Sequence, residues 1–428
     1  MRVIFALIIA STVSLLAFLA VAWQPAIAPV EPPSPASFAS DVVARGEVLA
    51  AAGNCATCHS SQLPPYAGGY RFQTPFGVLF SSNITPDPDT GIGRWSEAAF
   101  TRAMREGVAR NGSHLFPAFP FDHFTKLSDA DIKALYAYLM TVPPAKVVPP
   151  SNEISFPFNI RALQAAWKAL FLQKGGYRPD PARSAEWNRG AYLVEAVAHC
   201  GACHTPRNFL GAEQVGHPYG GGVVEGWVAP ALDISQSPLR WTTKDYVAYL
   251  RGAPTAHGSA FGPMAPVVKG LARLPDSDIQ AIATYFSTIN RSASPRPEHD
   301  MARALAAHTQ DVANVRDRGA RLYRGACASC HDNGGSGPTG ARGDLALSAS
   351  LWEADAGNFI RVVLDGIDSE RDLPSLMMPP FREVMNDDDL AALANYLRRT
   401  RTDRAQWSLT SKWVQRIRAG LPPETRAR

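Results

Sequence analysis

The chain has 428 residues, of which 46% are hydrophobic and 19% are charged, a composition typical of globular proteins and not of disordered or fibrous ones. This length favours two to four domains over a single hydrophobic core. The formal net charge is only +4 and no long run of Lys or Arg occurs, which argues against a nucleic-acid-binding surface.

The N-terminal segment is predicted to be a helix that directs export. Arg2 is followed by an uncharged apolar run from Val3 to Trp23, which as a helix is long enough to cross a bilayer. Cleaved signal peptides usually have a shorter apolar region, and Pro29 would hinder cleavage after Ala26-Ile27-Ala28. Arg2 keeps the N-terminus on the side of synthesis and sends the rest of the chain across the membrane. We expect residues 1–28 to be a signal peptide or a transmembrane anchor, and we favour a retained anchor.

All six cysteines fall in three Cys-Xaa-Xaa-Cys-His motifs. Two thiols at this spacing can form thioethers with the two vinyl groups of haem, and the histidine that follows can ligate the iron. A zinc site or a redox-active cysteine pair with a stray histidine could explain one copy, but not three copies that use every cysteine of an exported chain. Disulfides would not explain three histidines in the same place. The sequence therefore predicts three covalently bound haem c groups. Their expected ligands are Cys55, Cys58 and His59, then Cys200, Cys203 and His204, then Cys327, Cys330 and His331, each histidine being the proximal iron ligand.

Features around the motifs recur three times, which indicates three related domains. An Arg-Gly pair precedes each motif, a tryptophan begins an amphipathic stretch that ends near a glycine, and a last helix starts with acidic residues behind an N-cap candidate. These residues are Arg45-Gly46, Arg189-Gly190 and Arg318-Gly319, then Trp95, Trp241 and Trp352 with Gly107, Gly252 and Gly366, and then Tyr138, Tyr285 and Tyr396 in the last helix. Few strand patterns appear. We predict three mostly α domains at residues 41–145, 183–292 and 314–402, each around one haem, and a C-terminal tail at 403–428.

Four further stretches carry a resemblance to a known family. They are Ser82-Asn83-Ile84-Thr85-Pro86-Asp87, Arg105-Glu106-Gly107-Val108, Lys126-Leu127-Ser128-Asp129 with Ala134-Leu135-Tyr136-Ala137-Tyr138, and Ser259-Ala260-Phe261-Gly262-Pro263-Met264-Ala265. With the haem motifs, they make the chain from about Asp41 onward resemble the three-haem cytochrome c subunits of bacterial membrane-associated dehydrogenases. These serve alcohol, gluconate and aldehyde dehydrogenases and molybdenum hydroxylases such as nicotinate dehydrogenase.

The resemblance implies a fold and a function. The fold is three tandem class I-like cytochrome c domains. A catalytic dehydrogenase subunit would oxidise a small organic substrate, and this chain, with no catalysis of its own, would pass the electrons to ubiquinone or another respiratory acceptor. The resemblance and the N-terminal helix together place the chain at the periplasmic side of the bacterial inner membrane.

The sixth iron ligands of the second and third haems are expected to be methionines. Met264 falls between the tryptophan stretch and the last helix, the interval in which a loop must return to the distal face of the haem. Met377 and Met378 occupy the same interval of the third domain, and Met378 is favoured because it precedes Pro379 much as the family's axial methionine precedes a proline. The alternative for any methionine is that it fills the core.

The first domain departs from the family pattern, because Phe119 stands where many relatives have methionine. Phenylalanine cannot ligate iron. We favour His123 as the axial ligand, followed by His114 and Met140; alternatively, His123 is a loop residue near a propionate and the position is filled otherwise or open. His199, just before the second motif, is expected to be a helical residue or a neighbour of a haem propionate rather than a ligand.

Three function classes are considered. An electron-transfer subunit is favoured over a haem enzyme such as a peroxidase and over a free-standing electron shuttle. As the partner we favour a molybdenum hydroxylase acting on an aldehyde or an N-heterocycle, ahead of an alcohol or gluconate dehydrogenase. That preference is by analogy, because Phe119 with Asp122-His123-Phe124 and the tail from Gln406 to Arg418 resemble the hydroxylase branch.

Overall fold

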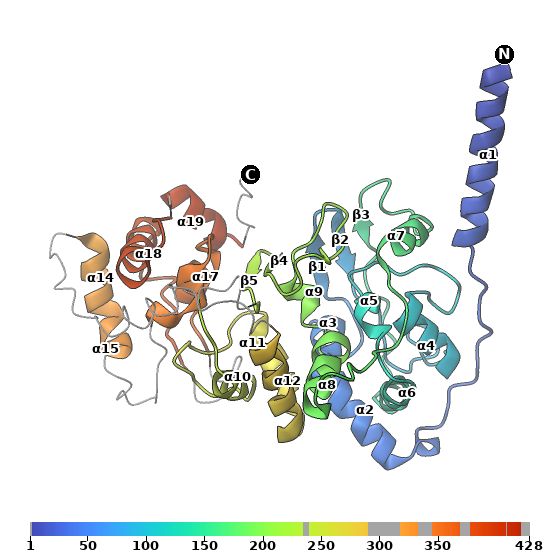
Figure 1. Ribbon diagram of the computed structural model, residues 1–428, viewed down its shortest axis with the longest axis horizontal. Coiled ribbons are helices and arrows are strands. Elements are labelled where there is room, and N and C mark those ends of the chain that lie inside the picture. The colour runs from blue at the N-terminus through green and yellow to red at the C-terminus, as the bar shows by residue number, and fades with distance from the viewer. Residues whose placement is uncertain are drawn as a thin grey trace. The chain divides into compact units, whose positions relative to one another are not determined.

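The structure is a computed structural model that describes residues 2–233, 239–289, 317–332, 345–368, 377–407 and 409–420. This part of the chain is mostly helical with five short strands, which confirms the predicted fold class (Figure 1). It divides into two compact units. The first unit comprises Met1–Asp180, Val194–His199 and Phe209–Ala212, and the second comprises Pro181–Leu193, Cys200–Asn208 and Glu213–Arg428.

The N-terminal helix α1 (Arg2–Ala22) is, among the described residues, the one helix long and apolar enough to cross a membrane. A signal sequence has the same character. The segment after α1 is bound to the rest of the first unit. The Pro25 carbonyl accepts a hydrogen bond from Arg102 Nη1 at 2.7 Å, and the Ile27 N–H donates to the Arg110 carbonyl at 2.8 Å.

A packed pair of helices recurs three times and forms the frame of each predicted domain. In every pair, the helix that leads into a haem motif packs against the last helix of the same domain. The pairs are α2 (Ser40–Ala52) with α6 (Asp129–Leu139), α8 (Ala185–Tyr192) with α12 (Asp276–Thr288), and α14 (Arg318–Ala326) with α18 (Asp387–Arg401).

The recurring Arg-Gly pairs explain how these helices pack. Each glycine faces the backbone of the partner helix so closely that a Cβ atom would lie 1.9 Å from Ala134 O at Gly46, 2.0 Å from Ala281 O at Gly190 and 2.4 Å from Ala392 O at Gly319. Only glycine permits this approach. Each neighbouring arginine forms an ion pair with the first turn of the partner helix, at 2.6 Å for Arg45 with Asp131, 2.7 Å for Arg189 with Asp278 and 2.7 Å for Arg318 with Asp389.

The remaining elements of the first unit surround this frame. Three antiparallel strands form a small sheet, with Val78 of the central strand opposite Gln73 on one side and Glu153 on the other. The strands are β1 (Arg71–Thr74), β2 (Gly77–Phe80) and β3 (Glu153–Ile154), and the helices are α3 (Cys55–His59), α4 (Glu97–Glu106), α5 (Phe121–Phe124) and α7 (Leu163–Phe171), with the 3₁₀ turn η1 (Pro35–Ser37).

The second unit contains the second and third motifs. Its second-domain elements, which follow a π-helical turn at Leu193–Val197, are α9 (Gly201–His204), the hairpin of β4 (Gly222–Val224) and β5 (Trp227–Ala229), α10 (Thr243–Leu250) and α11 (Met264–Leu271). Its third-domain elements are α15 (Ala328–His331), η3 (Leu345–Leu347), α16 (Ala349–Trp352), α17 (Gly357–Asp365) and, in the tail, α19 (Ser411–Arg418).

Some details of the predicted repeat are confirmed and others are wrong. Gly107, Gly252 and Gly366 all have the positive φ expected just beyond a helix. Trp352, however, ends α16 instead of beginning the next helix, which starts at Gly357. The expected side-chain cap is present on α6 and α18 but not on α12, because Pro275 occupies its N-cap position and has no side-chain acceptor.

The second and third domains share a hydrophobic core within the second unit. Leu239, 3% exposed, belongs to the buried cluster of the third domain, and Trp241 packs against the same cluster. Trp241 also stacks on the His257 ring with centroids 4.6 Å apart. The two domains are therefore one packed body rather than separate modules.

Candidate haem sites

Each motif lies on a short helix that follows the first helix of its domain. All six cysteines are within the described residues and none forms a disulfide. Burial raises the pKa of the Cys55 and Cys200 thiols to about 12 and that of Cys327 to about 11. A redox-active cysteine pair depends on a lowered thiol pKa. These surroundings therefore disfavour a redox-active pair.

The proximal histidines of the first two motifs are oriented by backbone carbonyls. His59 Nδ1 lies 2.7 Å from Ser82 O, and His204 Nδ1 lies 2.7 Å from Pro230 O. Because a carbonyl oxygen only accepts hydrogen bonds, Nδ1 must carry the proton and Nε2 must carry the lone pair. Burial lowers the pKa of both imidazoles and keeps them neutral. Metal-bound histidines commonly have this second hydrogen bond, so both residues fit an iron ligand.

The methionine candidates occupy comparable places in the second and third domains. Met264 is the first residue of α11, not part of a loop as expected, and packs half-buried against Ala260 and Val268. Met378 is half-buried against the core of the third domain, and its backbone forms a bridge with Ile367. Met377 is 60% exposed. Of the two adjacent methionines, Met378 is the one that faces inward.

The three candidates for the first haem lie in different surroundings. His114 uses both ring nitrogens, because Nε2 is 2.8 Å from Ala22 O and Nδ1 is 2.9 Å from the Nζ atom of Lys168. Met140 is 1% exposed at the end of α6. His123 is 6% exposed on α5, and its Nδ1 lies 2.9 Å from Glu195 O. His123 thus has the same tautomer as His59 and His204, whereas His114 has the opposite one.

His199 is not the helical residue that was one of its two sequence-based interpretations. It follows the π-helical turn with φ +39°, a left-handed conformation rather than a helical one. Its Nε2 donates to Gly53 O at 3.2 Å, and its ring lies against Phe124 with centroids 5.3 Å apart. His199 therefore joins the segment before the second motif to the segment before the first motif, within the first unit.

Two groups of residues at these sites have no sequence signal. Lys168 is buried, and its Nζ donates to Glu106 O and Gly107 O at 2.7 Å each, where the carbonyl end of α4 favours a cation. In the second unit, Arg361 on α17 donates to Gly226 O at 2.6 Å and lies over the Trp227 ring at 5.1 Å. Trp227 in turn contacts Phe261, three residues before Met264, with ring centroids 6.0 Å apart.

Comparisons with known proteins agree with this picture. Residues 43–143 match the family model of cytochrome c, and residues 314–397 match that of cytochrome c oxidase, cbb3-type, subunit III. Over 413 residues the chain is 36% identical to the fructose dehydrogenase cytochrome subunit of Gluconobacter japonicus, covering 91% of this chain and 85% of that protein. Over 406 residues it is 35% identical to the gluconate 2-dehydrogenase cytochrome c subunit of Pantoea cypripedii, covering 88% of this chain and 89% of that protein.

A further relative is a nicotinate dehydrogenase subunit of Pseudomonas putida, with 46% identity over 407 residues. That alignment covers 94% of this chain but 34% of the relative, so the chain spans about a third of its length. The fold, the haem motifs and these relatives define an electron-transfer c-type cytochrome that is not catalytic on its own. The chain belongs to the family of cytochrome c subunits of bacterial dehydrogenase complexes.

Proposed function

We propose that the chain carries three covalently bound haem c groups, one in each domain. The observation that carries this proposal is the helix pair that recurs three times. In each pair, a helix with an Arg-Gly sequence packs on a last helix whose aspartate binds the arginine, and the Arg-Gly helix leads into a complete haem motif. When bound, each haem supplies one-electron redox chemistry. The chain binds it through the two cysteines, ligates its iron through His59, His204 or His331, and surrounds it with packed side chains that exclude water.

The sixth ligands in this proposal are Met264 and Met378 for the second and third haems and His123 for the first. The inward position of Met378 supports it over Met377. The hydrogen bond between His123 Nδ1 and Glu195 O supports His123, because it leaves Nε2 as the nitrogen with the lone pair. A bis-histidine first haem would have a lower potential than the two methionine-ligated haems. It would therefore receive electrons first.

We further propose that the electrons come from a molybdenum hydroxylase that oxidises an aldehyde or an N-heterocycle and leave to ubiquinone or another respiratory acceptor. Identity to the nicotinate dehydrogenase subunit is 46%, against 32–36% for cytochrome subunits of fructose, gluconate and alcohol dehydrogenases. Iron–sulphur donors of such hydroxylases reach potentials low enough to reduce a bis-histidine haem.

The complex would lie on the periplasmic side of the inner membrane with α1 as its anchor. The bonds that Pro25 and Ile27 form with the first unit support retention of α1, because cleavage after Ala28 would remove both residues.

Isolation of the complex by a tag on this chain tests the choice of partner. Assays for molybdenum, flavin and pyrroloquinoline quinone in the purified complex should find molybdenum, and addition of the partner's substrate should reduce the haems. A complex with flavin or quinone cofactor and no molybdenum would overturn the choice of partner but leave the electron-transfer role intact.

A further inference from the structure

Helix α7 has an inverted distribution of polar and apolar side chains. Its polar residues Gln164 and Lys168 are 8% and 9% exposed, while Leu163 and Leu170 are 37% and 71% exposed. Lys168 is the only charged residue of the helix and is bonded to carbonyls inside the first unit. A surface helix in water normally buries its apolar stripe and exposes its charges. The outer face of α7 is therefore better suited to an apolar neighbour than to water.

Three more exposed side chains extend this face. Phe156 and Phe158 precede α7 and are 79% and 39% exposed, and Phe209 is 86% exposed. The Trp167 indole on α7 donates to Leu210 O at 3.0 Å, which holds the segment of Phe209 beside the helix. We call Phe156, Phe158, Leu163, Leu170 and Phe209 the apolar patch. Concentrations of exposed apolar groups of this kind mark interaction surfaces.

The patch lies beside the end of the membrane-spanning candidate. Helix α7 contacts α1 within the first unit. A chain of hydrogen bonds makes the same connection, from Lys168 Nζ to His114 Nδ1 and from His114 Nε2 to the Ala22 carbonyl at the end of α1. A bilayer that contains α1 would therefore meet the rest of the protein close to α7.

We infer that the apolar patch rests on the lipid surface of the membrane that α1 enters. This inference depends on the proposed anchoring of α1. Phenylalanine, tryptophan and leucine side chains are those that interfacial segments insert at the headgroup boundary. Arg161, between Phe158 and Leu163, donates to the His114 carbonyl at 2.8 Å and lies over the Phe116 ring at 4.7 Å. These contacts hold a positive charge beside the patch, which suits anionic headgroups. The patch and α1 would then hold the first haem domain in one orientation to the membrane.

Accessibility measurements on the full-length holoprotein test this inference. A spin label is attached to a single cysteine introduced as Leu170→Cys, as Phe209→Cys or, for a matched control, as Lys133→Cys on the exposed side of α6, which lies away from α7 in Figure 1. Each protein is reconstituted into vesicles of phosphatidylethanolamine and phosphatidylglycerol with the haems oxidised, and the relaxation of each label under nitrogen is subtracted as the baseline that includes the haem iron. Relaxation by oxygen, which concentrates in lipid, is compared with relaxation by a water-soluble nickel chelate.

We expect oxygen to relax the labels at 170 and 209 more strongly than the nickel chelate does, and the reverse at 133. Vesicle flotation tests the proposed anchoring by α1 separately from the inference about the apolar patch. Protein that floats but whose labels at 170 and 209 respond mainly to nickel would overturn the patch inference alone. If those labels lost nickel accessibility only after the catalytic subunit was added, the patch would be a protein-docking surface and the inference would also fall. Protein that does not float would overturn the anchor and the patch together.

Discussion

The environment of His123 separates it from the other candidate ligands of the first haem. Its ring is buried and its Nδ1 lies 2.9 Å from the Glu195 carbonyl, so its tautomer matches that of His59 and His204, whereas His114 has the opposite tautomer. We predict that His123→Ala converts one haem of three to the high-spin state and shifts its potential, leaving the other two unchanged. Optical and electron paramagnetic resonance spectra check this. His114→Ala is the control and should leave all three haems low-spin, and three low-spin haems in His123→Ala would exclude His123.

We predict that Lys168 makes the stability of the protein depend on pH. Its three acceptors favour the charged form, but burial and then the charge of Lys174 outweigh them and lower its pKa to about 7, with Glu106 opposing the shift. Between about pH 7 and the ordinary lysine pKa of about 10.4, the unfolded chain binds this proton and the folded chain does not. Stability must therefore rise with pH across this window.

Lys168→Met removes the titrating group, so we expect the guanidinium midpoint of the wild-type protein to rise relative to that of Lys168→Met between pH 7 and pH 9.5. Circular dichroism at both pH values gives the midpoints. Parallel pH dependence in the two proteins would show that the lysine keeps an ordinary pKa in the folded state.

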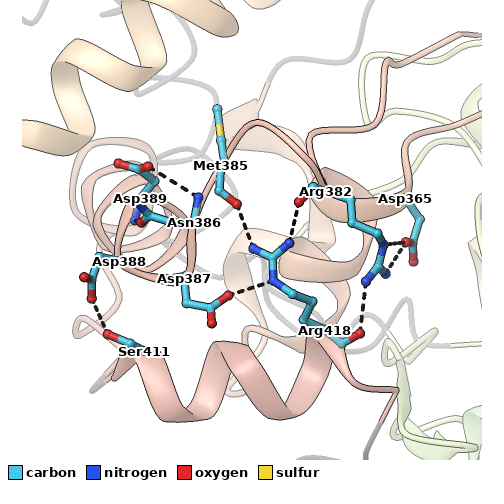
Figure 2. A network of polar contacts seen from close by, with 9 residues as sticks. All are labelled: Asp365, Arg382, Met385, Asn386, Asp387, Asp388, Asp389, Ser411 and Arg418. Carbon is cyan, nitrogen blue, oxygen red and sulfur yellow. Dashed lines mark hydrogen bonds and ion pairs between the residues drawn. The ribbon is translucent and has the colours of Figure 1, made fainter.

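At the scale of elements, helix α19 is attached to the third domain by its buried face, by a hydrogen bond from Ser411 to Asp388 and, above all, by Arg418. Arg418 donates to Asp387 Oδ1, to Arg382 O and to Met385 O, as Figure 2 shows. Arg382 in turn donates to Asp365 and to the Arg418 carbonyl, and Val414 and Ile417 on the inner face of α19 are buried. The C-terminal tail is therefore part of the domain and not an appendage to it.

Arg418→Met should destabilise this attachment by about 2 kcal/mol, because it leaves one carboxylate and two carbonyls without their charged donor. Amide hydrogen exchange of α19 should accelerate by roughly thirtyfold. Lys412→Met, a change at an exposed position of the same helix, should have no effect. Equal exchange in both variants would mean that the buried apolar face alone holds the helix.

A second element-level connection joins α17 to the segment that carries Met264. The Asn358 amide pairs with the backbone of Val228 at 3.0 and 2.7 Å, and Arg361 covers the Trp227 ring. A Cβ on Gly262 would lie 2.8 Å from that ring, so the tryptophan fixes the path of the chain two residues before Met264.

We predict that Arg361→Met weakens the near-infrared sulphur–iron band of the second haem and changes its potential in a redox titration. The first haem should keep its potential. Arg382→Met removes a charge from the same domain without touching Trp227 and serves as the control. A second haem unaffected by Arg361→Met would show that Trp227 is held without the arginine.

At the scale of the whole molecule, the threefold repeat could be predicted because its residues act locally and recur. Arg45, Gly46 and Asp131 make the same contacts as the equivalent residues of the second and third domains, so one sequence pattern describes all three helix pairs. The contact of Arg361 with Trp227 could not be predicted, since it joins different domains and has no counterpart elsewhere in the chain. The burial of Lys168 could not be predicted either, because a lone lysine in an apolar helix normally faces water.

The central claim is that three haems are attached through the six motif cysteines, and intact mass spectrometry of denatured protein tests it most directly. Protein matured with a working haem-attachment system should carry three haem masses that survive denaturation. Replacement of both cysteines in one motif, at positions 55 and 58, 200 and 203, or 327 and 330, should remove one haem mass each time. Two or fewer haem masses on fully matured wild-type protein would contradict the account.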